Sequence, residues 1–196
     1  MNLVFDPQLH AYYLNGKQIP SVTQVIKGAG LMPEYNGSSR QEVTQAMIYG
    51  TKVHKAVADI IAGNPIDADP FVAVAVMGFV EWQHLYKPDI YISEKLGASE
   101  KYGYAGTCDI GARTGNHKWL IDVKTGAYSP WHIVQLAAYN EIFKAEKFTK
   151  FGCLYLDPIE AGKFIFREFK RAEILSGFSV FLNAKNIYNW KTNNNG

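Results

Sequence analysis

Two acids and a lysine near the middle of the chain, Asp109, Asp122 and Lys124, have the spacing of residues that meet on one face of a β-hairpin. The segments around them alternate apolar and polar residues as strands do, and Gly115-Asn116 between them is typical of a two-residue turn. In a hairpin closed by this turn, the numbers of opposing residues add to 231, which pairs Asp109 with Asp122. We therefore expect their Cα atoms about 4.5–5.5 Å apart, with Lys124 about 7 Å further along the same face.

Two carboxylates held this close repel each other, and proteins keep such a pair where a cation, a shared proton or a nearby base offsets the repulsion. Oxygen ligands with open water positions suit a hard divalent ion, and Mg²⁺ or Mn²⁺ fits best. On the opposite face the same register pairs Cys108 with Val123, as a half-buried hairpin requires. The alternative is two unrelated surface aspartates with Lys124 as a local ion-pair partner, and a turn shifted by one residue would separate the acids.

A histidine lies on an apolar stripe whose spacing predicts a helix from about residue 39 to residue 62. The members of this stripe are Val43, Met47, Gly50, His54, Val57 and Ile61. Gly50, one turn before His54, leaves room for the close approach of a backbone or a ligand. A lone histidine on such a face is either a metal ligand or a hydrogen-bonded core residue, and the sequence leaves both readings open.

Three further polar residues are candidates for the same cleft. Glu94 ends a predicted strand that precedes the acids, and its alternative is a simple surface carboxylate. Gln135 and Tyr139 stand four residues apart on the helix predicted after Lys124, so they share one face. The alternative places Tyr139 in the core and Gln135 at its rim.

Turn, cap and periodicity signals predict a single α/β domain with a mixed sheet. Asn15-Gly16 predicts a hairpin of residues 10–14 and 17–20, and the capping boxes Ser21-Val-Thr-Gln24 and Ser39-Arg-Gln-Glu42 predict two helix starts. Asp69-Pro70 and Ser129-Pro130, each a cap before a first-turn proline, predict two more. The other expected elements are the helix 71–86, apolar on nearly all sides and well covered, strands 90–94, 104–113 and 117–125, the helix ending near 146, strands 151–156 and 163–169, the helix 172–190 and a polar tail 191–196.

The composition supports a packed core. Of the 196 residues, 47% are hydrophobic and 19% charged, which excludes a disordered chain, a collagen-like fibre and a charge-rich coiled coil. Residues 1–7 show no secretory signal, and the longest apolar run, residues 71–80, is too short to cross a bilayer, so we expect a soluble intracellular protein. The net charge of +2 divides into −3 for residues 1–100 and +5 for residues 101–196; the basic half suits a polyanionic partner or solvated surface lysines.

Four short motifs, in this order, resemble those of the PD-(D/E)XK nuclease superfamily and of its RecB-like exonuclease branch. They are Gly50-Thr-Lys-Val-His54, Gly106-Thr-Cys-Asp109, Asp122-Val-Lys124 and Gln135-Leu-Ala-Ala-Tyr139. The resemblance covers about residues 38–170, and the segment 13–23 is also similar to phage-encoded and mitochondrial-genome-maintenance-type exonucleases of this branch. It implies a restriction-endonuclease-like αβββαβ core with a mixed sheet and a helical N-terminal extension. The implied layout of residues 1–196 is one nuclease domain, with a hairpin and short helix in 1–37, the catalytic core in 38–170, and a C-terminal helix and tail in 171–196.

The resemblance also implies a role for each matching residue. Lys124 would orient or deprotonate the attacking water and offset charge on the scissile phosphate; with a pKa lowered by a nearby cation it could act as a base. Gln135 and Tyr139 would steady the active site or the DNA backbone. The implied metal ligands are Asp109, Asp122, the main-chain carbonyl of Val123, His54 and Glu94.

The activity that the resemblance implies is a Mg²⁺- or Mn²⁺-dependent deoxyribonuclease, with one or two ions, that hydrolyses phosphodiester bonds at DNA ends in replication, repair or recombination. An iron–sulfur cluster, present in some relatives, is excluded because the chain has only Cys108 and Cys153. Implied partners are single- or double-stranded DNA ends and a recombination or single-strand-annealing protein, with no membrane, in the cytoplasm of a bacterium or a phage-infected host cell. The alternatives are a structure-specific endonuclease of the same fold and a catalytically inactive DNA-binding module.

Two weaker interpretations concern other residue types. A structural zinc protein built on His54, His117, His132 and a cysteine is disfavoured because these residues lack tight ligand spacing. Aromatic side chains that could stack on unpaired bases, or simply belong to the core, are Trp82, Tyr102, Tyr104 and Trp131.

Overall fold

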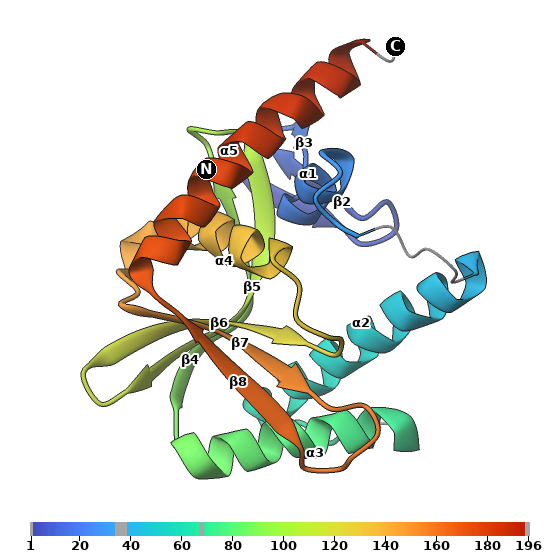
Figure 1. The fold of residues 1–196 in the computed structure, drawn as a ribbon, viewed down its shortest axis with the longest axis vertical. Coiled ribbons are helices and arrows are strands. Elements are labelled where there is room, and N and C mark those ends of the chain that lie inside the picture. The colour runs from blue at the N-terminus through green and yellow to red at the C-terminus, as the bar shows by residue number, and fades with distance from the viewer. Residues whose placement is uncertain (1, 34–38, 67–68, 195–196) are drawn as a thin grey trace.

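The structure is a computed structural model that describes residues 2–33, 39–66 and 69–194. Its centre is a mixed sheet in the order β4-β5-β6-β7-β8 (Figure 1). β6 and β7 are parallel and the other neighbours are antiparallel. The strands are β4 (Asp89–Ser99), β5 (Tyr104–Thr114), β6 (His117–Lys124), β7 (Lys150–Leu156) and β8 (Phe164–Phe169).

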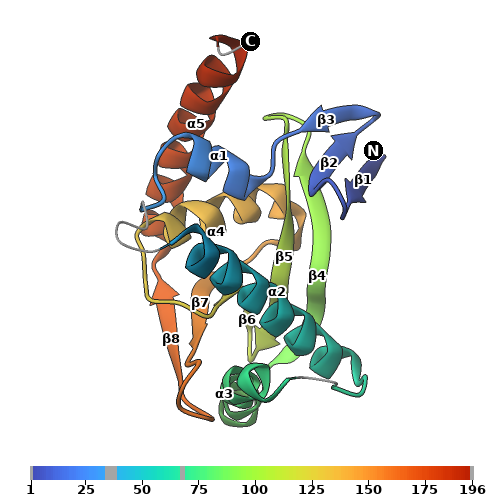
Figure 2. The same cartoon turned by 90° about the vertical axis from the view of Figure 1, so that its right-hand side faces the viewer.

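Helices cover both faces of this sheet (Figure 2). One face carries α2 (Arg40–Ala62) and α3 (Pro70–Tyr86), which share a core cluster with β6 and β7. The other face carries α1 (Val22–Gly28), α4 (Trp131–Ile142) and α5 (Arg171–Asn194), which share a second cluster. The order α2, α3, β4, β5, β6, α4, β7 confirms the expected αβββαβ core with a mixed sheet.

A second, small antiparallel sheet forms the N-terminal extension together with α1. Its strands are β1 (Leu3–Asp6), β2 (Ala11–Leu14) and β3 (Lys17–Ile19). The β2–β3 hairpin is confirmed, whereas β1 was not predicted, because four residues are too few for a periodicity signal. Tyr12 and Ile19 of this sheet pack on Ala98 and Ala105, so the extension lies against the last residues of β4 and the first residues of β5.

The predicted helix starts are largely confirmed by their hydrogen bonds. Ser21 and Gln24 cap each other's backbone, at 3.0 and 2.8 Å, and Ser39 and Glu42 do the same at α2. Asp69 caps α3, with a proline in its first turn. These bonds satisfy amide groups that a helix start otherwise leaves without partners.

Several predicted boundaries are wrong. Ser129 does not cap α4 with its side chain, and the backbone N–H of Ser129 instead donates to the ring of His132. α4 ends at Ile142, and a separate 3₁₀ turn (Lys144–Glu146) follows. β4 continues five residues beyond Glu94 because it stays paired with β5 as far as Ser99 opposite Tyr104. The expected polar tail is helical as far as Asn194, while residues 195–196 lie outside the described residues.

The expectation that α3 is covered on nearly all sides is also wrong. Trp82 and Phe79 are buried, but Phe71, Met77 and Leu85 are exposed, because only one side of the helix meets the sheet. On α2 the apolar stripe is buried only in its second half, and Met47 in the first half is 65% exposed. None of the helices in the described ranges has the length and apolar character needed to cross a membrane.

The hairpin register predicted from the turn is confirmed as far as Ile110 opposite Ile121. There the β5–β6 ladder ends, and β5 continues beside β4 alone. The expected pairing of Cys108 with Val123 is therefore wrong: Cys108 packs in the cluster beside α4, and Val123 in the cluster beside α2 and α3. The expected pairing of Asp109 with Asp122 in the ladder is also wrong: Asp109 lies one residue before Ile110, where β5 separates from β6, and Asp122 pairs with Cys153 of β7.

Gly106 has no space for a side chain, because a Cβ there would lie 2.5 Å from Cε1 of the buried Tyr139. We expect Gly106→Ala to lower the free energy of unfolding by about 1–3 kcal/mol, the usual cost of overpacking a tight core. Gly126→Ala is the control, since an added Cβ at Gly126 would meet nothing within 4 Å. Urea unfolding measures both variants, and a Gly106→Ala protein as stable as the wild type would contradict the close packing.

Candidate metal and active site

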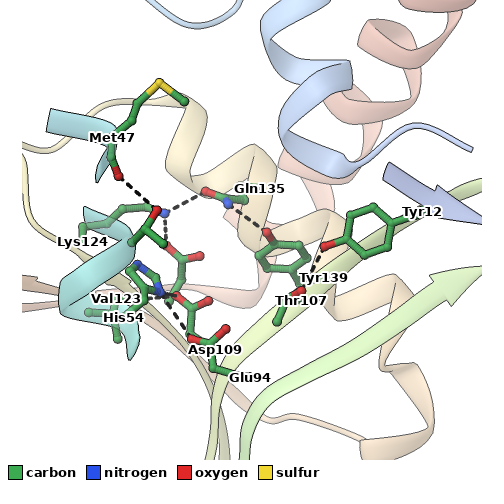
Figure 3. A network of polar contacts seen from close by, with 12 residues as sticks. Tyr12, Met47, His54, Glu94, Thr107, Asp109, Val123, Lys124, Gln135 and Tyr139 are labelled. Carbon is green, nitrogen blue, oxygen red and sulfur yellow. Dashed lines mark hydrogen bonds and ion pairs between the residues drawn. The ribbon is translucent and has the colours of Figure 1, made fainter. Parts of the chain in front are cut away.

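Three potential metal ligands converge where β5 leaves β6. The ligand atoms of His54, Glu94 and Asp109 all lie within 4.8 Å of one another, and Figure 3 shows the three side chains pointing toward one another. His54 Nδ1 is 3.4 Å from Glu94 Oε1 and 3.6 Å from Asp109 Oδ2. Opposite ligands of an octahedral Mg²⁺ are about 4.2 Å apart, since each bond is about 2.1 Å, so one ion can bridge a set of this size.

Two features of the backbone position these acids. The backbone N–H of Val123 donates to Asp109 Oδ2 at 2.8 Å, which orients the carboxylate at the end of the ladder. Glu94 has a left-handed backbone with φ of 47° between two regularly paired residues of β4. That conformation costs a non-glycine residue of order 1–3 kcal/mol and is concentrated at functional sites. It distorts the strand locally at the residue whose carboxylate contacts His54.

Asp122 lies beside this set rather than within it. The residue is 1% exposed, and its carboxylate forms an ion pair with the Lys124 ammonium. Apart from that contact, neither carboxylate oxygen has a hydrogen-bond partner in the described part of the chain. Buried carboxylates without partners are costly, so these oxygens fit a site that receives a cation. The residues present therefore fit a divalent metal, and the oxygen-rich donor set suits Mg²⁺ or Mn²⁺.

The site residues predicted on α4 connect to Lys124 in a line (Figure 3). Lys124 Nζ donates to Gln135 Oε1 at 2.9 Å, and Gln135 Nε2 donates to the Tyr139 hydroxyl at 2.9 Å. The ring of Tyr139, one helical turn after Gln135 on α4, packs against Gly106 of β5. The lysine head group is therefore held by β6 on one side and by α4 on the other.

Burial and the neighbouring charges shift the pKa values of the acids and of His54. Burial raises the pKa of the Asp122 carboxyl to about 6, although Lys124 pulls in the opposite direction. Burial also raises the pKa of Asp109, with His54 opposing. At His54, burial lowers the pKa, but the carboxylates of Asp109 and Glu94 outweigh it and bring the pKa to about 9. Without a metal, the imidazolium supplies the positive charge between the acids, and an incoming cation must displace its proton.

The pKa of Lys124 is raised, not lowered. Burial alone would lower it, but the carboxylates of Asp122 and Asp109 have the larger combined effect. The closest neighbours of Lys124 in the metal-free site are acids, and the expectation that a nearby metal cation lowers its pKa stays a prediction. In this state Lys124 is a fixed positive charge.

The structure brings together the residues predicted as metal ligands and catalytic groups. His54, Glu94 and Asp109 form the compact set, Asp122 and Val123 border it, and Lys124 leads to Gln135 and Tyr139. The main-chain carbonyl of Val123, predicted as a ligand, stays a prediction. Tyr12 was not predicted: its hydroxyl is 3.0 Å from Thr107 Oγ1, beside the acids. Nothing in the sequence signals this contact, because 95 residues separate the two partners.

A groove of about 600 Å³ opens beside His54 and Lys124, both of which line it. One side is the first half of α2, with Met47 and Tyr49. The other side is the segment from the end of β6 into α4, with Tyr128 and Trp131. The metal set thus lies next to a space large enough for a ligand.

No model of a known protein family and no curated protein matches the sequence. The chain is similar to the solved structure of LHK-Exo, an alkaline exonuclease from Laribacter hongkongensis, at 14% identity and a TM-score of 0.43, over 88% of this chain and 91% of that one. LHK-Exo in complex with dAMP aligns at 13% identity and a TM-score of 0.44, over 89% and 92%. SSO0001 aligns at 15% and 0.32, over 88% of each chain. TM-scores below 0.5 support no conclusion, so function must be inferred from the residues themselves.

We expect Mn²⁺ to stabilise the folded chain, since a ligand that binds only the native state at 100 times its Kd adds about 2.7 kcal/mol. Asp109→Asn should lose most of that gain, because it removes a charge from the three-ligand set. Asp59→Asn is the control: Asp59 also carries a carboxylate on the metal side of the sheet, but pairs with Lys55 at 2.6 Å. Scanning calorimetry with and without Mn²⁺ measures the gain, and an equal gain in Asp109→Asn would rule out this metal site.

His132, a buried neutral histidine that lines the groove, makes the free energy of unfolding depend on pH. Burial, aided by Lys124, lowers the pKa of His132 to about 3, and its Nδ1 lies 2.9 Å from the Tyr155 hydroxyl. Because the unfolded chain takes up this proton near pH 6.5 and the native chain does not, stability falls as the pH drops from about 6.5 toward 3. His132→Asn keeps an acceptor near Nδ1 and does not titrate. Between pH 7.5 and 5.5, urea unfolding should show the wild type losing about 1.4 kcal/mol relative to this variant; parallel pH curves would contradict the assignment.

Proposed function

We propose that this chain is a metal-dependent deoxyribonuclease of the PD-(D/E)XK type, in its RecB-like branch, that hydrolyses phosphodiester bonds at DNA ends. The observation that carries the proposal is the convergence of His54, Glu94 and Asp109 beside the buried Asp122, whose oxygens have no partner in the described residues besides the Lys124 ammonium. A lysine bound to Asp122 stands next to them. Two acids that can hold a divalent metal, beside a lysine that can offset charge on a phosphate, suit phosphodiester hydrolysis.

Each residue has a chemical task in this proposal. A phosphodiester resists attack because its anionic oxygens repel a nucleophile, and a bound Mg²⁺ or Mn²⁺ offsets that charge and lowers the pKa of a coordinated water. The ligands we assign are His54, Glu94, Asp109, Asp122 and the carbonyl of Val123. Lys124 holds a positive charge against the scissile phosphate, where preformed charge is most effective. Gln135, fixed by Tyr139, keeps the lysine head group in place.

The resemblance of the four motifs to the RecB-like exonuclease branch is what favours cleavage at ends. The first half of α2 forms one side of the groove that contains Lys124, so side chains border the site on two sides. Such a groove can receive a strand, and the choice between an end and an internal segment is left to the experiment below.

The proposal predicts metal-dependent digestion of DNA labelled at its 5′ or 3′ terminus, abolished by EDTA. Asp122→Asn and Lys124→Gln should each lower kcat by roughly 100-fold or more, the usual effect of removing one preorganised charge at a reacting centre. Lys55→Gln, on the exposed side of α2, is the control and should keep full activity. Closed circular DNA should stay intact while linear DNA is degraded from an end.

Three outcomes would contradict the proposal in distinct ways. Cleavage that persists in EDTA or in Asp122→Asn would exclude the metal mechanism. Cutting of closed circles would identify the endonuclease. Binding of DNA without any metal-dependent product would identify the inactive binding module.

A further inference from the structure

The groove beside the metal set has an unusual lining for a surface that faces water. Met47 is 65% exposed and Tyr128 is 39% exposed, and Trp131 is half-buried between them and Lys124. Trp82 and Tyr104, the other large aromatic candidates, are fully buried and cannot contact a ligand. Exposed apolar side chains gathered around a groove indicate a ligand with an apolar surface of its own.

The charge of the groove points to an anion. Among its lining residues in the described chain there is no aspartate or glutamate, and the Lys124 ammonium supplies positive charge. Trp131 lies under the Lys124 ammonium, whose nitrogen is 5.4 Å from the ring centre. A ligand with flat apolar faces and negative charges at regular spacing fits this combination, and a nucleic-acid strand is such a ligand.

Arg167 extends this positive charge away from the metal set. Its guanidinium lies 3.7 Å from the centre of the Tyr128 ring, which holds it flat. Within the described residues no carboxylate forms an ion pair with Arg167, so its N–H groups are free to meet a phosphate. Asp122, Cys153 and Arg167 are consecutive partners across β6, β7 and β8, which places Arg167 about 10 Å from Asp122 between Cα atoms.

We propose that this groove binds the unpaired nucleotides next to the scissile phosphate, with bases against Met47, Tyr128 and Trp131 and a neighbouring phosphate on Arg167. The inference rests on the proposed function for its substrate class and specifies that the strand is single where it meets the enzyme. Bases in a duplex are stacked on each other and present only their edges to a protein. Aromatic side chains reach base faces only in unpaired strands, which they bind with little sequence preference.

The test is the affinity of the full chain for a fluorescein-labelled oligothymidylate in EDTA, measured by anisotropy. Trp131→Ala and Tyr128→Ala should each weaken binding by roughly 10-fold, the usual effect of losing one stacked base. Trp131→Phe should restore most of the affinity because it keeps a ring. Arg167→Gln should also weaken binding and reduce the slope of log affinity against log salt by about 0.7, the value for one phosphate on a single strand.

Matched controls separate these effects from general losses. Trp190→Ala removes an exposed tryptophan from the far part of α5. Arg113→Gln removes an arginine that also lies on a tyrosine ring, at 4.4 Å, but is paired with Asp89. Both should leave the affinity within two-fold of the wild type, and thermal unfolding verifies that every variant is folded.

The outcomes distinguish this inference from the proposed function. Binding that follows the predicted pattern in a chain without metal-dependent cleavage would keep the groove and reject the nuclease. Cleavage with single-strand affinity unchanged in Trp131→Ala, Tyr128→Ala and Arg167→Gln would keep the nuclease and reject the groove. Failure of the wild type to bind oligothymidylate, or equal binding of a blunt duplex with the same dependence on Trp131, would also overturn the inference.

Discussion

The burial of two carboxylates at the point where β5 and β6 separate is the constraint on which the rest of this structure depends. Asp109 is 8% exposed and Asp122 is 1% exposed, and each would be costly without a compensating charge. The compensation comes from different elements: His54 from α2, Lys124 from β6, and a backbone N–H from Val123. The position of α2 and the end of the β5–β6 ladder bring these groups together around the two carboxylates.

The backbone of β4 is strained beside these acids. A regular strand would place Glu94 in an ordinary extended conformation, but its φ of 47° places it in the left-handed region. The neighbours Ser93 and Lys95 still pair with β5, so the distortion is local. The distortion occurs at the residue whose carboxylate contacts His54. Backbone strain of this kind is concentrated at functional sites.

The contacts of α4 give the site its rigidity. Lys124, Gln135 and Tyr139 form one hydrogen-bonded line, and Tyr139 packs on the only residue type that leaves it space, Gly106. The buried His132 lies on the next face of the same helix and binds Tyr155 of β7. The helix is thereby tied to three strands of the sheet, while its first residue, Trp131, remains available to the groove.

Local signals in the sequence determined the hairpin turns, the capped starts of α1, α2 and α3, and the hairpin register as far as Ile110 opposite Ile121, because each depends on neighbours a few positions away. Only the tertiary structure decided that Asp109 accepts from Val123 instead of pairing in the ladder, that Glu94 is left-handed, and that Tyr12 reaches Thr107. It also decided that α3 and the first half of α2 leave apolar side chains exposed. These features arise where strands diverge and where segments far apart in the chain meet. Hydrophobic periodicity cannot predict such places, because it indicates which residues are buried and not which residues they pack against.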